Sequence, residues 1–175
     1  MKKTFSVAFC AMCAALISVI MLLGYIPNLT YTVPAVAGLV LMIVLIETNL
    51  KNTIATFVVS SIICFFICET QVKILFILLF GVYPWLKSII DRVKSMVLSY
   101  IIKFAYFNAA AIAFYFITAF ITGVNPLGDS VKTTFEILFL FFANIVFFIY
   151  DFALSKVAAF YIVRLHGAVK KILKL

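Results

Sequence analysis

The sequence has 175 residues, of which 67% are hydrophobic and 11% are charged, and its mean hydropathy is +1.28. Soluble domains carry about a quarter charged residues, so this composition excludes a single soluble core and indicates a chain surrounded by lipid. The net charge is +8, but the basic residues stand at the ends of apolar stretches, which favours membrane topology over nucleic-acid binding.

Apolar runs broken by charges, Pro, Gly and Asn predict an all-α, polytopic membrane bundle that forms one transmembrane domain, residues 1–175. The six predicted spans are 4–24, 33–46, 54–68, 72–90, 97–121 and 133–163. The second and third are shorter than the ~20 residues that a perpendicular span needs. They must recruit flanking residues, cross a thinned region or form one re-entrant pair.

The distribution of basic residues predicts how the spans are oriented. With a cytoplasmic N-terminus and six crossings, only Lys73 and Lys132 of the 14 lysines and arginines fall outside. This asymmetry follows the positive-inside rule and predicts that both termini are cytoplasmic. A four-crossing alternative, with 33–68 as a re-entrant hairpin, also keeps both ends inside but leaves Lys51 outside or at depth.

The first predicted helix carries small side chains at three- and four-residue steps. This stripe consists of Ala8, Ala11, Ala15 and Ser18. Such a smooth face lets another helix approach closely, so it is a candidate partner-docking surface. Packing inside the bundle explains the same pattern.

The outer side of the predicted topology holds candidate substrate-binding residues. The loop 25–32 is polar and aromatic, and it can fold over an outward-facing cavity. The candidates at this side are Asn28, Tyr31, Glu69, Lys73 and Glu136. Glu69 with Lys73, and Lys132 with Glu136, also have the spacing of plain surface ion pairs on a helix.

Three polar residues lie near mid-depth of the last two spans. Asn108 and Asn144 complete the candidate substrate-binding set, because polar groups in hydrocarbon are costly and mark sites. Hydrogen bonding between helices is the alternative role for both. Asp151 lies seven residues beyond Asn144 on about the same helix face, and either Lys156 or Lys103 can pair with it.

The cytoplasmic end of the fourth span has two local features. Pro84 removes a backbone donor and is predicted to kink the span. The segment 87–99 has charged and apolar residues in a helical pattern, which predicts an amphipathic stretch on the cytoplasmic face. A partner-binding surface and a solvated turn between two helices both fit that stretch.

The sequence contains no recognised catalytic or nucleotide-binding motif, so we expect neither an enzyme nor a chain that uses ATP itself. Two cysteine pairs, Cys10 with Cys13 and Cys64 with Cys68, lie within apolar spans and have no nearby histidine. We therefore interpret them as packing residues and expect no metal and no cofactor.

Taken together, the chain resembles the substrate-binding S components of energy-coupling factor (ECF) vitamin transporters. The likeness lies in its length, its six helices with cytoplasmic ends, the outer loop 25–32 and the stripe Ala8, Ala11 and Ala15. The resemblance implies a bacterial plasma membrane location and a vitamin-like ligand held in an outer-half cavity. It also implies that the first helix docks on a transmembrane T subunit, with two ATPase subunits as the energy source.

Two other classes of function fit the same pattern. One is a non-transporting scaffold similar to MreD-type cell-shape proteins, which would dock through the segment 87–99. The other is a stand-alone facilitator, for which Asn108, Asn144 and Asp151 would line a pore. No motif in the sequence identifies the ligand.

Overall fold

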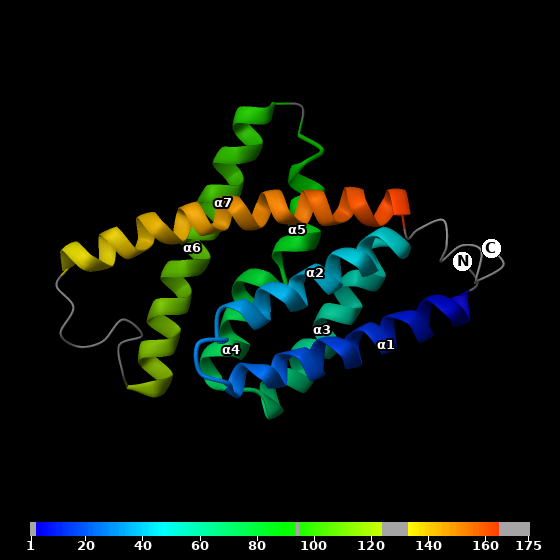
Figure 1. Ribbon diagram of the computed structural model, residues 1–175, viewed down its shortest axis with the longest axis horizontal. Helices are drawn as coiled ribbons and strands as arrows, with labels where there is room; N and C mark the ends of the chain where they lie inside the picture. The colour runs from blue at the N-terminus through cyan, green and yellow to red at the C-terminus, as the bar shows by residue number, and fades with distance from the viewer. Residues whose placement is uncertain (1–2, 94, 124–132, 165–175) are drawn as a thin grey trace.

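The computed structural model describes residues 3–93, 95–123 and 133–164, and these ranges contain helices and no strand (Figure 1). The elements are α1 (Lys3–Leu22), η1 (Leu23–Tyr25), α2 (Thr32–Glu47), α3 (Leu50–Ile67), α4 (Thr70–Leu75), η2 (Phe76–Phe80), α5 (Tyr83–Ile90), α6 (Met96–Thr122) and α7 (Thr133–Arg164). The predicted all-α bundle is confirmed.

Five described stretches are long and apolar enough to cross a bilayer. They are Thr4–Tyr25, Leu50–Ile67, Thr70–Ile90, Met96–Ile121 and Leu140–Arg164. The third predicted span begins at residue 54, whereas α3 begins at Leu50 and reaches 18 residues. Only α2, with 16 residues, stays clearly shorter than the ~20 residues of a perpendicular span.

This short helix lies between two apolar cores. The buried members of the first core are Ile17, Met21, Val33, Ala37, Leu41, Cys64, Cys68, Val72 and Phe76. Those of the second are Leu79, Tyr83, Phe107, Ala110, Phe147, Tyr150 and Leu154, with Leu39 and Met42 of α2 packed against them. Because α2 faces both cores, it is apolar nearly all round, as expected for a helix surrounded by others. Three of the four cysteines, Cys13, Cys64 and Cys68, are buried, as predicted for packing residues.

The fourth span is interrupted before Pro84, as predicted. Proline has no N–H and cannot donate to the carbonyl of Phe80, so the regular helical ladder stops there. The backbone widens into the π turn η2, where the N–H of Gly81 donates to the carbonyl of Phe76 at 2.7 Å. Tyr106 of α6 donates its hydroxyl to the carbonyl of Leu78 at 2.6 Å. A side chain from another helix thus stabilises the interruption.

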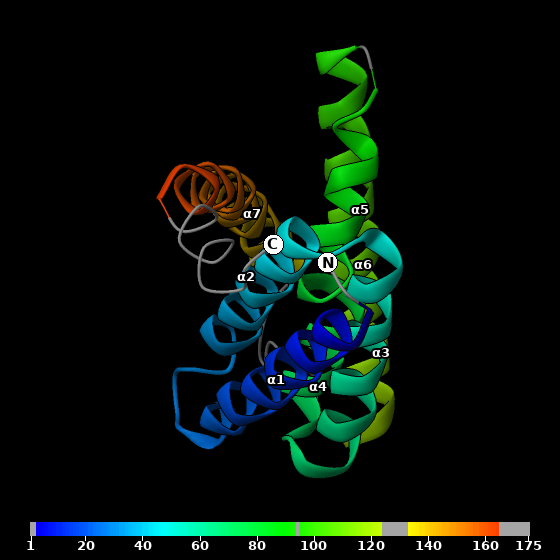
Figure 2. The same cartoon turned by 90° about the vertical axis from the view of Figure 1, so that its right-hand side faces the viewer.

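The helices do not all run side by side. In Figure 1, α6 crosses α7 steeply, and the ends of α5 and α6 next to residues 91–95 project beyond the other helices. Figure 2 shows the same projection from the side, with α7 viewed nearly along its axis. The start of α1 and the end of α7 lie on the same side in Figure 1.

Candidate functional site: a buried charge ring and an exposed helix face

Four charged side chains from α5, α6, α7 and the α5–α6 turn meet inside the bundle. Lys87, Lys103 and Asp151 are only 2%, 5% and 7% exposed, whereas the side chain of Asp91 is 45% exposed. Lys87 lies in the middle of α5, and Asp91 directly follows that helix. Ionisable groups inside a membrane protein are costly and are first candidates for a site.

These four residues form a closed ring in which the charges alternate. Lys87 pairs with Asp151 and lies 3.6 Å from the carboxylate of Asp91. Lys103 completes the ring, since its Nζ lies 2.6 Å from Asp91 Oδ1 and 3.4 Å from Asp151 Oδ2. The hydroxyl of Tyr83 also donates to Asp151 Oδ1 at 2.5 Å. We call Lys87, Asp91, Lys103 and Asp151 the charge ring.

The ring is electrically balanced, with two ammonium groups and two carboxylates in contact. Burying such charges costs free energy, and removing one partner leaves an uncompensated charge that costs more. The ring therefore joins the α5–α6 hairpin to α7 at the point where these helices cross. Of the two partners considered for Asp151, Lys103 is correct, whereas Lys156 lies over the ring of Phe152.

The two predicted mid-depth asparagines bind each other. The amide nitrogen of Asn108 donates to Asn144 Oδ1 at 3.0 Å, and that of Asn144 donates to Asn108 Oδ1 at 3.1 Å. Each amide also donates to the carbonyl four residues earlier in its own helix, at 2.8 Å. Both hydrogens of each amide are used in this way. The interhelical hydrogen bond is thus present, and a ligand at these amides would have to replace it.

The outer loop is tied to the corner between α3 and α4. The hydroxyl of Tyr25 donates to the carbonyl of Ile67 at 2.7 Å. Gly24 is buried against α4, and a Cβ at this position would lie 2.7 Å from a methyl carbon of Val72. These contacts place the loop with the predicted residues Asn28 and Tyr31 on the same side as Glu69 and Lys73.

The predicted outer residues whose side chains are described are exposed or half-buried. Asn28 and Tyr31 are exposed, and Asn28 has a left-handed backbone with φ of 71°. Lys73 makes no ion pair with Glu69 within the described residues; its ammonium donates to the carbonyl of Phe65 at 3.3 Å. Glu136 lies in α7, but its side chain is outside the described part of the chain.

The three alanines of the stripe on α1 are exposed, whereas its serine is half-buried. Ala8, Ala11 and Ala15 are exposed, while Cys13, Ala14, Ile17 and Met21 form the buried face. Ser18 is half-buried at the edge of the stripe and donates to the carbonyl of Ala14 at 2.9 Å. Of the two explanations for this stripe, packing inside the bundle is therefore wrong for its three alanines.

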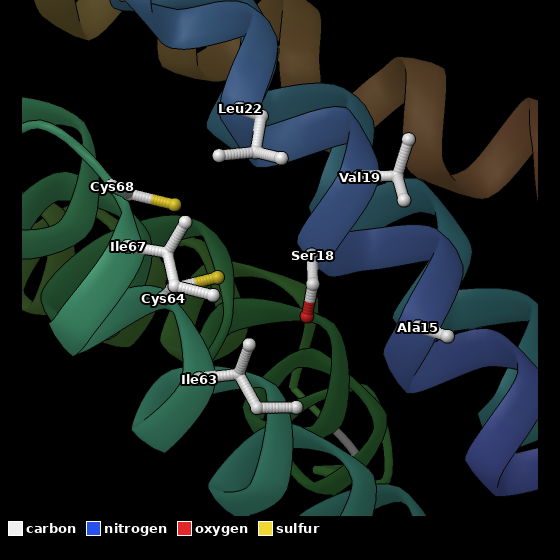
Figure 3. Close-up of a pocket in the computed structure, with 8 residues that line it drawn as sticks. All are labelled: Ala15, Ser18, Val19, Leu22, Ile63, Cys64, Ile67 and Cys68. Carbon is white, nitrogen blue, oxygen red and sulfur yellow. The ribbon is translucent and has the colours of Figure 1, made fainter.

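An apolar pocket lies beside the stripe, between α1 and α3 (Figure 3). It has a volume of about 320 Å³ and is lined by Ala15, Ser18, Val19, Leu22, Ile63, Cys64, Ile67 and Cys68. Two residues of the predicted docking stripe, Ala15 and Ser18, border this pocket. A pocket with this lining suits an apolar group and offers few hydrogen bonds.

The charge ring was only partly visible in the sequence. Lys87 and Lys103 fall inside predicted spans 72–90 and 97–121, and this position in hydrocarbon is the signal that could have identified them. The predicted amphipathic stretch 87–99 is not one helix, since α5 ends at Ile90 and α6 begins at Met96. Lys87 faces the interior because Asp151 neutralises it, and Lys94 lies outside the described residues.

Comparison with known proteins provides no family for this chain. No protein-family model, no curated protein and no solved structure matches it, so its function has to be inferred from its own residues.

Proposed function

We propose that this protein is the substrate-binding membrane subunit of an ECF-type transporter that takes up a vitamin-like micronutrient. Its partners are a transmembrane T subunit and two ATPase subunits, and its location is a bacterial plasma membrane. The observation that carries the proposal is the exposure of Ala8, Ala11 and Ala15 on α1. A face of small residues that the bundle itself does not use is available to a second membrane protein.

The chemistry of this face suits a helix of a partner subunit. In lipid, helices associate through close packing, and alanine lets two backbones approach because its side chain is one methyl group. On the same helix, Cys13, Ala14, Ile17 and Met21 hold α1 to the rest of the bundle. Docking at the alanines would therefore leave the internal contacts of α1 in place.

The ligand side of the proposal rests on the outer loop 25–32. The hydrogen bond from Tyr25 to Ile67 and the close approach of Gly24 to Val72 hold the base of this loop against the α3–α4 corner. Asn28 and Tyr31 then remain exposed with polar groups available to a solute. A loop anchored at one end and exposed beyond it is suited to closing over a ligand.

The alternative functions have less support from the side-chain contacts. A facilitator would need Asn108, Asn144 and Asp151 to face a pore, but the two amides bind each other and Asp151 belongs to the charge ring. A scaffold that docks through residues 87–99 would have only part of this stretch available, because Lys87 is buried in the charge ring while Arg92 is exposed.

Bulk placed on the α1 stripe tests the proposal. Ala11→Trp and Ala15→Trp should abolish co-purification with an ATPase-containing membrane complex, because the indole prevents close helix approach. Leu16→Trp is the matched control, since Leu16 is also exposed on α1, at 50%, but lies outside the stripe. The measurement is quantitative mass spectrometry of proteins retained through gentle detergent purification, with monodisperse elution as the test of folding.

Three results would contradict the proposal. Unchanged association of both alanine variants excludes the stripe as the docking surface. Equal loss in Leu16→Trp shows a general defect of α1. Uptake of solute into liposomes by the purified chain alone would instead support a facilitator.

A further inference from the structure

The C-terminal half of α7 carries a stripe in which aromatic and basic residues alternate at four-residue steps. Phe152, Lys156, Phe160 and Arg164 make up this basic–aromatic stripe, and all four are exposed. The Nζ of Lys156 lies 5.0 Å from the ring centroid of Phe152, and the Cζ of Arg164 lies 5.8 Å from that of Phe160. Each cation is thus held over the aromatic ring of the preceding turn.

The bundle does not use this stripe. The opposite face of the same helix segment supplies Asp151 to the charge ring, Leu154 to the second core and the buried side chain of Tyr161. No carboxylate in the described part of the chain lies within ion-pair distance of Lys156 or Arg164. Two exposed cations therefore lack a protein counter-charge within those residues.

The apolar stretch Leu140–Arg164 contains the stripe, but the charge pattern within it favours a membrane-surface position for Lys156 and Arg164. Residues 137–155 contain one charged side chain, Asp151, and the charge ring neutralises it. At ~1.5 Å per residue this stretch is about 28 Å long, close to the ~30 Å hydrocarbon core of a bilayer. Lys156 is then the first cation beyond the core, and Arg164 lies about 12 Å further along the helix. By the positive-inside prediction this surface is the cytoplasmic one.

We propose that the basic–aromatic stripe binds the headgroups of anionic phospholipids at the cytoplasmic membrane surface. The two cations supply the charge that is complementary to the phosphates. Phe152 contacts the acyl boundary, and Phe160, about 6 Å beyond Lys156 along the helix, lies in the interfacial layer that aromatic rings favour. Both rings are more than half exposed, at 57% and 58%, so lipid can reach them. The inference depends on the membrane fold and does not depend on the proposed transport function.

Native mass spectrometry of the full chain from mixed micelles tests this inference. The probes are phosphatidylglycerol and phosphatidylcholine at equal concentration, and the variants are Lys156→Gln, Arg164→Gln and their combination. Each substitution should reduce retained phosphatidylglycerol about fivefold relative to phosphatidylcholine, because one basic residue near an anionic surface contributes ~1 kcal/mol. Circular dichroism and elution volume establish that the variants are folded.

Two matched variants make the result specific. Lys73→Gln removes a cation that also lies 5.0 Å from a phenylalanine ring, but at the opposite end of the predicted topology, so it should retain phosphatidylglycerol. The charge-conserving pair Lys156→Arg and Arg164→Lys should also retain it. Equal retention by the double Gln variant and the native chain would overturn the proposal. Equal loss in Lys73→Gln, or complete displacement by an equal concentration of soluble glycerophosphate, would do the same.

Discussion

Asp151 receives donors from three side chains on two other helices, and this arrangement explains how a carboxylate is tolerated inside the bundle. Lys87 and Tyr83 reach it from α5, and Lys103 reaches it from α6. Asp91 balances the second lysine, so the ring as a whole carries no net charge. A residue that would be costly alone becomes a fixed connection between helices.

Removing the charge of Asp151 should destabilise the protein strongly. In Asp151→Asn, two buried lysines keep only Asp91 as a counter-charge, and breaking a buried pair in this way costs about 3–5 kcal/mol. Thermal unfolding in detergent, followed by circular dichroism, measures the effect. Lys156→Gln is the control, because Lys156 is exposed on the same helix and outside the ring.

A double variant separates charge balance from loss of packing. Lys87→Met combined with Asp151→Leu removes one charge of each sign and leaves the pair of Lys103 with Asp91. This variant should be more stable than Asp151→Asn, since no uncompensated charge remains. If Asp151→Asn unfolds at the temperature of Lys156→Gln, the ring does not stabilise the bundle.

At the scale of single helices, α2 is the element on which the others converge. It is 16 residues long, and it packs against both apolar cores. Gly38 lies where α2 contacts the interrupted fourth span. A Cβ there would lie 2.3 Å from the hydroxyl of Tyr150 and 2.7 Å from the carbonyl oxygen of Phe80. The absence of a side chain is therefore what permits this contact.

Gly38→Ala should destabilise the bundle by about 1–3 kcal/mol, the usual cost of forcing extra atoms into a packed interior. Gly38→Ala combined with Tyr150→Phe should recover only part of the loss, because the Phe80 carbonyl still collides with the new methyl group. Chemical unfolding of both variants in the same detergent compares them. An unchanged free energy of unfolding in Gly38→Ala would show that the space between α2 and η2 accommodates a methyl group.

For the whole molecule, the six-crossing topology makes a prediction at the turn between α2 and α3. Six crossings place Asn49 on the cytoplasmic side, whereas a re-entrant hairpin at 33–68 places it outside or at depth. Asn49 is exposed, as is Tyr31 in the outer loop, so both accept a cysteine label.

Labelling of intact cells with a membrane-impermeant maleimide tests this topology in a chain whose four native cysteines are replaced. Tyr31→Cys should react in intact cells, and Asn49→Cys should react only after permeabilisation. Equal labelling of both positions in intact cells would favour the four-crossing alternative.

The fold class, the helical type of the elements and the approximate helix positions could be predicted from the sequence, because they depend on local composition. Long apolar runs need lipid or a helical neighbour wherever they occur, and Pro84 interrupts a helix in any context. The α7 spacing from Asn144 to Asp151 also indicated that both share a face. From these features the sequence predicted the membrane bundle, the break in the fourth span and one correct ion-pair partner for Asp151.

Only the tertiary structure decided which side chains meet. Residue spacing along one helix shows which residues share a face, but it does not show which residues of another helix lie opposite them. The charge of Lys87 faces the interior because α7 brings Asp151 to it, and the segment 87–99 divides into two helices at the same place. The steep crossing of α6 and α7 aligned Asn108 with Asn144. The sequence by itself determined a membrane bundle with a small-residue stripe on its first helix; the fold determined that the alanines of that stripe face outward.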